Sequence, residues 1–144
     1  MKVLFVCTAN INRSQIAEAI FNRLSRKNHA TSAGLRVGRS DFLLREAHNN
    51  PVIPMMKEGY NLSKARIKRL NKKRVDSAGK VVILYNKERR LKEMPRYLQG
   101  RKDLERWKVN SISDETPFDE YCKLEKRRIG QINKHVKELV QRIG

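Results

Sequence analysis

The chain has 144 residues, of which 39% are hydrophobic, and this is enough for one core, so we treat residues 1–144 as a single domain. Its 33 Lys and Arg against 15 Asp and Glu give a formal net charge of +18, which attracts acidic or polyanionic partners. No apolar run is long enough to span a membrane, and two distant cysteines do not form a disulfide framework, so we expect a cytoplasmic protein without membrane contact.

The first half of the chain alternates between apolar strands and amphipathic helices. A buried strand is predicted over residues 2–6, and a helix with an apolar stripe follows from residue 14 to near residue 28. A strand of small residues is expected over 31–34, and a helix over 52–58 that stops at a glycine. A short basic helix is expected over 64–70, with its two apolar residues turned inward.

The second half repeats this alternation. Residues 80–85 are the clearest interior strand, residues 86–104 are polar and helical with breaks, and residues 107–109 form a last strand. Thr116 is expected to cap the closing helix, with a proline at its first helical position. This order predicts an α/β fold: a three-layer sandwich with a central parallel four-stranded sheet flanked by helices.

One motif follows the first strand directly. Cys7 is followed by five residues, then Arg13 and Ser14, where the helix begins. The turn and the helix N-terminus direct N–H groups and partial positive charge at one spot, and arginine adds a planar fork suited to phosphate. A cysteine in such a place is stabilised as a thiolate and can attack phosphorus. The alternative is a buried cysteine at a strand end, followed by a surface arginine.

The motif resembles the signature V-C-x-G-N-x-C-R-S-P of the low-molecular-weight protein tyrosine phosphatases, whose fold is shared by thioredoxin-coupled arsenate reductases. The likeness extends over almost the whole chain, through the segments 31–35, 58–66 and 75–83. It implies a phosphate-binding loop after the first strand, in which Cys7 forms a phosphocysteine intermediate. The loop residues that would bind the substrate phosphate are Thr8, Ala9, Asn10, Ile11, Asn12, Arg13 and Ser14.

The resemblance also implies separate roles within the loop. The Arg13 fork and the backbone amides of the loop would hold the phosphate oxygens and the charge of the transition state. The Ser14 hydroxyl would donate to the Cys7 sulfur and stabilise the thiolate. Asn10 would hold the loop through side-chain hydrogen bonds, because asparagine tolerates left-handed backbone.

Cleavage of a phosphate ester also needs a proton donor for the leaving oxygen and a base for water. In the family this group is the aspartate of an Asp-Pro loop before the last helix, and Asp114 occupies that place here, without a following proline. We assign Asp114 as the general acid and base, with Glu115 as the second choice. Asp119 is interpreted as a residue of the first helical turn.

Other positions depart from the family pattern. Ala9 replaces a glycine, Asn12 replaces the second cysteine of the loop, and Gln15 replaces the proline at the helix start. Ile11 matches the tyrosine-type enzymes, whereas relatives that act on phosphoarginine carry threonine.

The usual aromatic walls around phosphotyrosine are missing. On one side only Phe118 is a candidate wall residue, and on the other the loop of Val37, Gly38 and Arg39 has no aromatic residue before Phe42.

Three functions remain open. The first is a cysteine-dependent phosphatase without metal or cofactor, acting on phosphomonoesters and in particular on protein phosphotyrosine. The second is an arsenate reductase, for which only Cys122 remains as a further thiol, a residue that we expect to pack in the last helix. The third is a weakly active docking module for a phosphorylated or polyanionic partner, which would use the basic surface around residues 64–74. Nucleic acid is not favoured as the primary target, because no nucleic-acid motif accompanies the charge.

Overall fold

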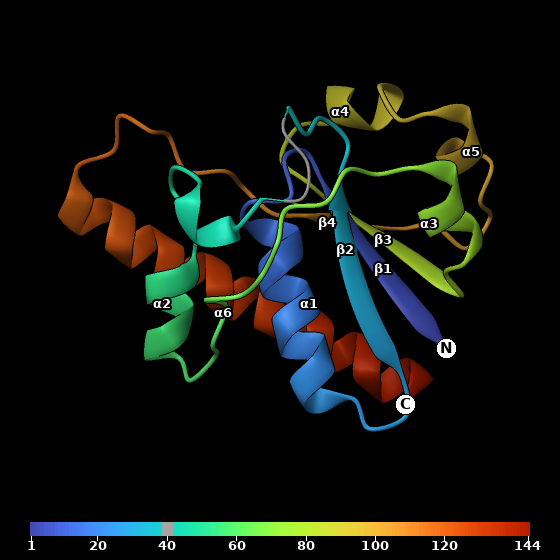
Figure 1. Cartoon of the computed structure of the whole chain (residues 1–144), viewed down its shortest axis with the longest axis horizontal. Helices are drawn as coiled ribbons and strands as arrows, with labels where there is room; N and C mark the ends of the chain where they lie inside the picture. Colours follow the sequence, from blue (N-terminus) through green and yellow to red (C-terminus); the bar gives the residue numbers. More distant parts are fainter. Residues whose placement is uncertain (39–41) are drawn as a thin grey trace.

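The computed structural model describes residues 1–38 and 42–144, so the expected wall residue Arg39 lies outside the described residues. Four parallel strands form one sheet in the order β2-β1-β3-β4 (Figure 1). The elements are β1 (Lys2–Cys7), α1 (Arg13–Leu24), β2 (His29–Gly34), the 3-10 turn η1 (Leu44–Glu46), α2 (Val52–Lys57), α3 (Lys72–Asp76), β3 (Lys80–Tyr85), α4 (Arg89–Lys92), α5 (Arg96–Gln99), β4 (Glu105–Lys108) and α6 (Phe118–Ile143).

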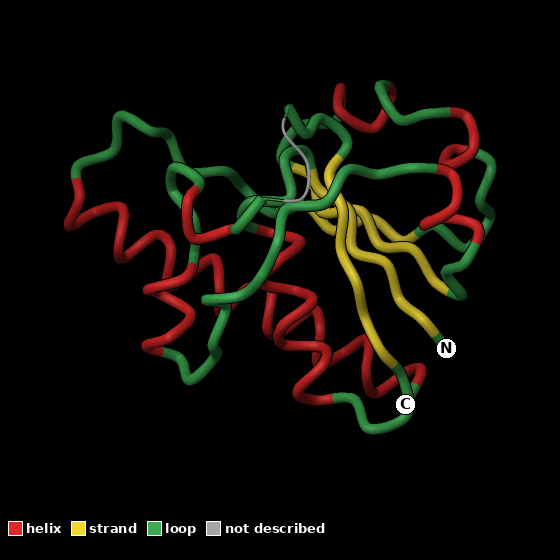
Figure 2. Tube along the Cα trace, in the orientation of Figure 1, coloured by secondary structure: helices red, strands yellow, loops and turns green. Residues whose placement is uncertain are grey.

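Helices cover both faces of the sheet, as the alternation of elements predicts (Figure 2). Because successive strand residues point to opposite faces, β1 contributes Val3 and Phe5 to the core beneath α1 and α6. Leu4 and Val6 join the second core, which includes Val75 of α3 and other residues on that side. The three-layer α/β sandwich is therefore confirmed.

The long helix α6 closes the first core. Its buried apolar residues recur at helical spacing, as predicted: Ile129, Ile132, Val136 and Leu139. Trp107 of β4 is buried between Phe5 and His135 and anchors the last strand to this core. None of the helices in the described part of the chain combines the length and apolarity that a bilayer crossing needs.

The basic helix predicted over 64–70 is wrong, because this segment is extended. Arg66 pairs with Leu43 in an antiparallel bridge, and Arg69 pairs with Gly34 in a parallel one. These pairings give the backbone groups tertiary partners, such as Gly34 O for the Leu70 N–H at 2.9 Å, which outweigh the local helical pattern. Ile67 is nevertheless buried, as expected.

Helix ends also differ from the predictions. Helix α1 stops at Leu24, because Ser25 is extended. Helix α6 begins at Phe118 with Pro117 in the N-cap position, so Thr116 is not the cap. By contrast, the polar segment 86–104 is helical with breaks, as predicted: it forms two short helices, α4 and α5, with Pro95 at the start of the second.

Candidate active site

The phosphate-loop segment connects β1 to α1 at the carboxyl edge of the sheet. Strand β1 lies between β2 and β3, so the chain departs to both sides of it, and this switch point is where open α/β sheets bind ligands. The loop is fixed to its neighbour by backbone bonds from Leu35 N to Cys7 O and from Arg36 N to Thr8 O. Cys7 is only 3% exposed, and its Sγ lies 2.9 Å from Ser14 Oγ, which is the contact predicted from the sequence.

Asn10 is the structural centre of the loop. Its φ of 57° is left-handed, and its side-chain amide donates to Ser14 Oγ at 2.8 Å and to Ser32 Oγ at 3.0 Å. Its Oδ1 accepts from Lys68 N at 2.9 Å. The predicted role of Asn10 in holding the loop is thus confirmed. Ala9 does not adopt a left-handed backbone, so this position does not need the conformational freedom of the family glycine.

Gln15 takes a structural role at the position where the family has proline. The side chain is fully buried, and its Nε2 donates to Asn10 Oδ1 at 3.0 Å and to Arg66 O at 2.8 Å. The amide therefore connects the loop to the extended segment that carries Arg66. This segment replaces the helix expected there, and its backbone carbonyl is available for that reason.

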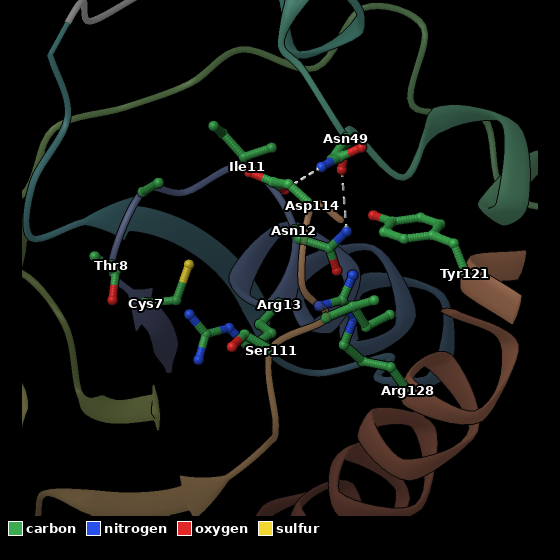
Figure 3. A pocket seen from close by; sticks show the side chains of 12 residues that line it. Cys7, Thr8, Ile11, Asn12, Arg13, Asn49, Ser111, Asp114, Tyr121 and Arg128 are labelled. Carbon is green, nitrogen blue, oxygen red and sulfur yellow. Dashed lines mark hydrogen bonds between the residues drawn. The ribbon is translucent and has the colours of Figure 1, made fainter. Parts of the chain in front are cut away.

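Arg13 lies at the start of α1 and is 9% exposed, with Nη1 at 3.4 Å from Val109 O. Burial lowers the pKa of the Arg13 guanidinium, the nearby Cys7 sulfur raises it, and Arg128 and Arg90 lower it. A guanidinium remains charged at neutral pH in spite of such shifts. Figure 3 shows this group beside Cys7, where its planar fork can bind an anion.

A buried ion pair from α6 reaches the same pocket. Glu125 is 1% exposed and accepts from Arg128 Nη2 at 2.7 Å and from Arg128 Nε at 3.2 Å. Its Oε2 also accepts from Asn12 Nδ2 at 3.1 Å, so the residue in place of the family's second cysteine is tied to α6. Figure 3 places the Arg128 guanidinium beside Asn12. This ion pair was not predicted from the sequence.

The pocket above Cys7 has a volume of about 240 Å³ (Figure 3). Asp114 lines it and accepts a hydrogen bond at Oδ1 from Asn49 Nδ2, whereas Glu115 is not among the lining residues. The structure thus brings Asp114 to the pocket and leaves Glu115 outside. Asp119 lies in the first turn of α6, as interpreted from the sequence.

The aromatic residue at the pocket is not the expected one. Phe118 is 79% exposed and lies outside the pocket, whereas Tyr121, one helical turn later, lines it. Burial, together with the Glu125 carboxylate, raises the pKa of Tyr121, so its hydroxyl keeps its proton at neutral pH. Ile11 and Ile112 add apolar surface to the pocket.

Cys122 does not pack in the last helix as predicted, because it is exposed on α6. Cys7 is the one cysteine in the lining of the pocket. In residues 1–38 and 42–144, no three His, Cys, Asp or Glu side chains come together in a way that could hold a metal ion.

The sequence profile of the low molecular weight phosphotyrosine protein phosphatases matches residues 2–143, from the first strand to the last helical residue. The chain belongs to this family. Among curated proteins, no sequence matches the chain. Solved structures do match, beginning with a low molecular weight protein tyrosine phosphatase from T. tengcongensis that is 27% identical, with a TM-score of 0.70 and coverage of 96% of this chain and 99% of that one.

Two further structures share the fold at lower identity. An arsenate reductase in a phosphate-binding state is 24% identical, with a TM-score of 0.74 and coverage of 99% of this chain and 98% of that one. A mutant of YwlE from Bacillus subtilis, a protein described as an arginine phosphatase, is 19% identical, with a TM-score of 0.74 and coverage of 99% and 98%. Membership of the family implies a phosphatase. At these identities, the likeness to the arsenate reductase and to YwlE shows only that the three chains share a fold.

Proposed function

We propose that this family member is a cysteine-dependent phosphatase that hydrolyses phosphomonoesters, in particular protein phosphotyrosine. The observation that carries the proposal is the arrangement at one small pocket of Cys7 with its Ser14 partner, the Arg13 guanidinium and the Asp114 carboxyl group. A nucleophile, an anion-binding fork and a proton donor are the groups that this reaction requires.

In the first step, the Cys7 thiolate attacks phosphorus and the ester P–O bond breaks. Protonated Asp114 gives its proton to the leaving oxygen, and the phosphoryl group stays bonded to the Cys7 sulfur as the phosphocysteine intermediate. Throughout this step, the Arg13 fork and the loop amides hold the equatorial oxygens. The Ser14 hydroxyl, 2.9 Å from Sγ, stabilises the sulfur when it carries negative charge.

In the second step, the Asp114 carboxylate takes a proton from a water molecule, and the water oxygen bonds to phosphorus. The P–S bond then breaks, which releases inorganic phosphate and restores the Cys7 thiolate. Because Asp114 gives a proton in one step and takes one in the next, a single carboxyl group serves both.

Phosphotyrosine is supported by the lining of the pocket. Ile11, Ile112 and the ring of Tyr121 offer a partly apolar surface to an aromatic leaving group. An arsenate reductase is less well supported, because Cys7 has no other cysteine beside it in the pocket to which an oxidised sulfur could pass.

The deciding experiment is hydrolysis of p-nitrophenyl phosphate by the wild type and by Cys7→Ser, without added thiol. We expect turnover by the wild type and a loss of at least about 10³-fold in the variant, because serine is not ionised at neutral pH. Cys122→Ser serves as the control and is expected to behave as the wild type. Hydrolysis that survives in Cys7→Ser would contradict the proposal, as would a wild type that turns over arsenate with a thiol but no ester.

Asp114→Asn is expected to lower kcat by about 10²–10⁴-fold on phenyl phosphate, whose leaving group needs a proton. The variant keeps the shape of the side chain and still binds phosphate through Arg13, so inorganic phosphate should inhibit it as before. Steady-state kinetics on phenyl phosphate measures the loss, and Glu115→Gln is the matched control. Normal turnover in Asp114→Asn combined with a large loss in Glu115→Gln would transfer the role to Glu115.

A further inference from the structure

Asp114 lies in the loop between β4 and α6, which has no Asp-Pro sequence to fix it. The side chain is exposed, and the backbone contact nearest to it is local, from Thr116 N to Ser113 O at 3.1 Å. Asn86 Nδ2 donates to Ser111 Oγ at 2.9 Å, which holds the start of the loop but not the Asp114 carboxyl group. A proton donor must nevertheless present one oxygen to the leaving group in a defined direction. The carboxyl group therefore needs a positioning partner from elsewhere in the fold.

Asn49 is placed to be that partner. Its Nδ2 donates to Asp114 Oδ1, and both residues line the pocket above Cys7 (Figure 3). Its φ of 58° is left-handed, a conformation that asparagine tolerates better than most residues. The turn that holds it is fixed by Asn50, which donates to Ala47 O at 2.8 Å and accepts from Val52 N at 3.0 Å.

Asn49 is also connected to the phosphate loop. Its carbonyl oxygen accepts from Asn12 Nδ2 at 3.4 Å, and the same amide group donates to Glu125 Oε2 at 3.1 Å. Asn12 Oδ1 is buried and accepts no hydrogen bond, so the two bonds that Asn12 Nδ2 donates determine the orientation of this side-chain amide. The Glu125–Arg128 pair in turn fixes Glu125 within α6.

From these contacts we infer that Asn49 is a positioning residue for the general acid, held in register with the phosphate loop by Asn12 and the Glu125–Arg128 pair. The inference rests on the proposed phosphatase function and adds a residue to it. Because Asn49 donates to Oδ1, Oδ2 is the oxygen left to carry the proton toward the ester. An amide does not titrate, so it can hold Asp114 in this orientation in both steps.

The test compares aryl phosphates whose leaving groups differ in their need for a proton. Asn49→Gly is the informative variant, because glycine adopts a left-handed backbone without strain and only the side-chain amide is lost. The rate compared is kcat/KM, because it reports the first step, in which the leaving group departs, and does not include the hydrolysis of phosphocysteine that all esters share. We expect kcat/KM on phenyl phosphate to fall about 10-fold or more, and kcat/KM on 2,4-dinitrophenyl phosphate to change less than about 2-fold. Asn49→Asp, which replaces the donor by an acceptor, should show the same selective loss.

Two reference variants make the outcome decisive. Asp114→Asn sets the full selective loss, and Asn61→Ala, which removes an exposed side chain outside the pocket lining, should leave both rates unchanged. If Asn49→Gly lowers both rates equally, or neither, while Asp114→Asn is selective, the positioning role is wrong and the phosphatase function stands. A non-selective Asp114→Asn overturns the inference as well. Activity that survives in Cys7→Ser overturns the proposed function itself.

Discussion

Arg13→Lys is expected to lower kcat/KM for p-nitrophenyl phosphate by about 10²–10³-fold, the cost of removing a preorganised donor from an oxyanion site. Lysine keeps the positive charge but loses the planar fork, so two parallel N–H bonds to the phosphate become one flexible contact. Because the side chain at this position is only 9% exposed, water has little access to replace the N–H bonds that lysine cannot make. Arg13 is the first residue of α1 and directly follows the loop whose amides would bind the same phosphate in the proposed reaction.

The measurement is steady-state kinetics together with inhibition by inorganic phosphate. Because the fork contributes most to the transition state, kcat should fall more than the affinity for phosphate. Arg142→Lys is the matched control: Arg142 pairs with Glu105 on the surface, and its replacement should leave the kinetics unchanged. A loss of less than about 5-fold in Arg13→Lys would mean that the positive charge alone, and not the geometry of the fork, binds the phosphate.

The sheet and the turn from β1 into α1 could be predicted because their signals are local. Residues 3–6 and 81–84 are continuous apolar runs within the strands predicted over 2–6 and 80–85. Such runs are typical of strands buried on both faces, and both are central strands in the structure. Cys7, Arg13 and Ser14 lie within eight consecutive residues, so their proximity follows from one turn between a strand and a helix. In a motif of this kind, the short sequence separation itself brings the side chains together.

The extended segment 64–70 could not be predicted in this way. Its backbone pairs with Leu43 and Gly34, which are more than 20 residues away in the sequence, and no local pattern records such partners. The same segment provides Arg66 O, which accepts a hydrogen bond from Gln15. The structural role of Gln15 therefore could not be predicted either. Burial of Ile67 was predictable, because an inward apolar side chain is compatible with either conformation.

The pocket residues outside the loop after β1 could not be predicted for a related reason. Asn49 and two residues of α6, Tyr121 and Arg128, reach the pocket only through tertiary packing. One signal was nevertheless present. The apolar stripe of α6, continued back by four residues from Ile129, reaches Glu125 and then Tyr121. A carboxylate in register with a buried stripe indicates a buried partner, which the structure shows to be Arg128.

Glu125→Ala is expected to destabilise the protein by about 3–5 kcal/mol, because it leaves the Arg128 charge buried without its partner. Arg128 also lies close enough to Arg13 to lower the pKa of the Arg13 guanidinium. Without Glu125, repulsion between these two positive charges adds to the loss of stability. The loss of the Glu125 acceptor further leaves one Asn12 N–H without its bond.

Urea denaturation of the wild type, Glu125→Ala, Arg128→Met and the double variant Glu125→Leu/Arg128→Met measures each change in the free energy of unfolding. The double variant should recover most of the stability that Glu125→Ala loses, because apolar residues of similar volume remove both charges together. Glu138→Ala, an exposed change on the same helix, controls for helix propensity and should have little effect. If Glu125→Ala costs less than about 1 kcal/mol, Arg128 must find water or another anion, and the pocket would then hold a second exposed cation beside Arg13.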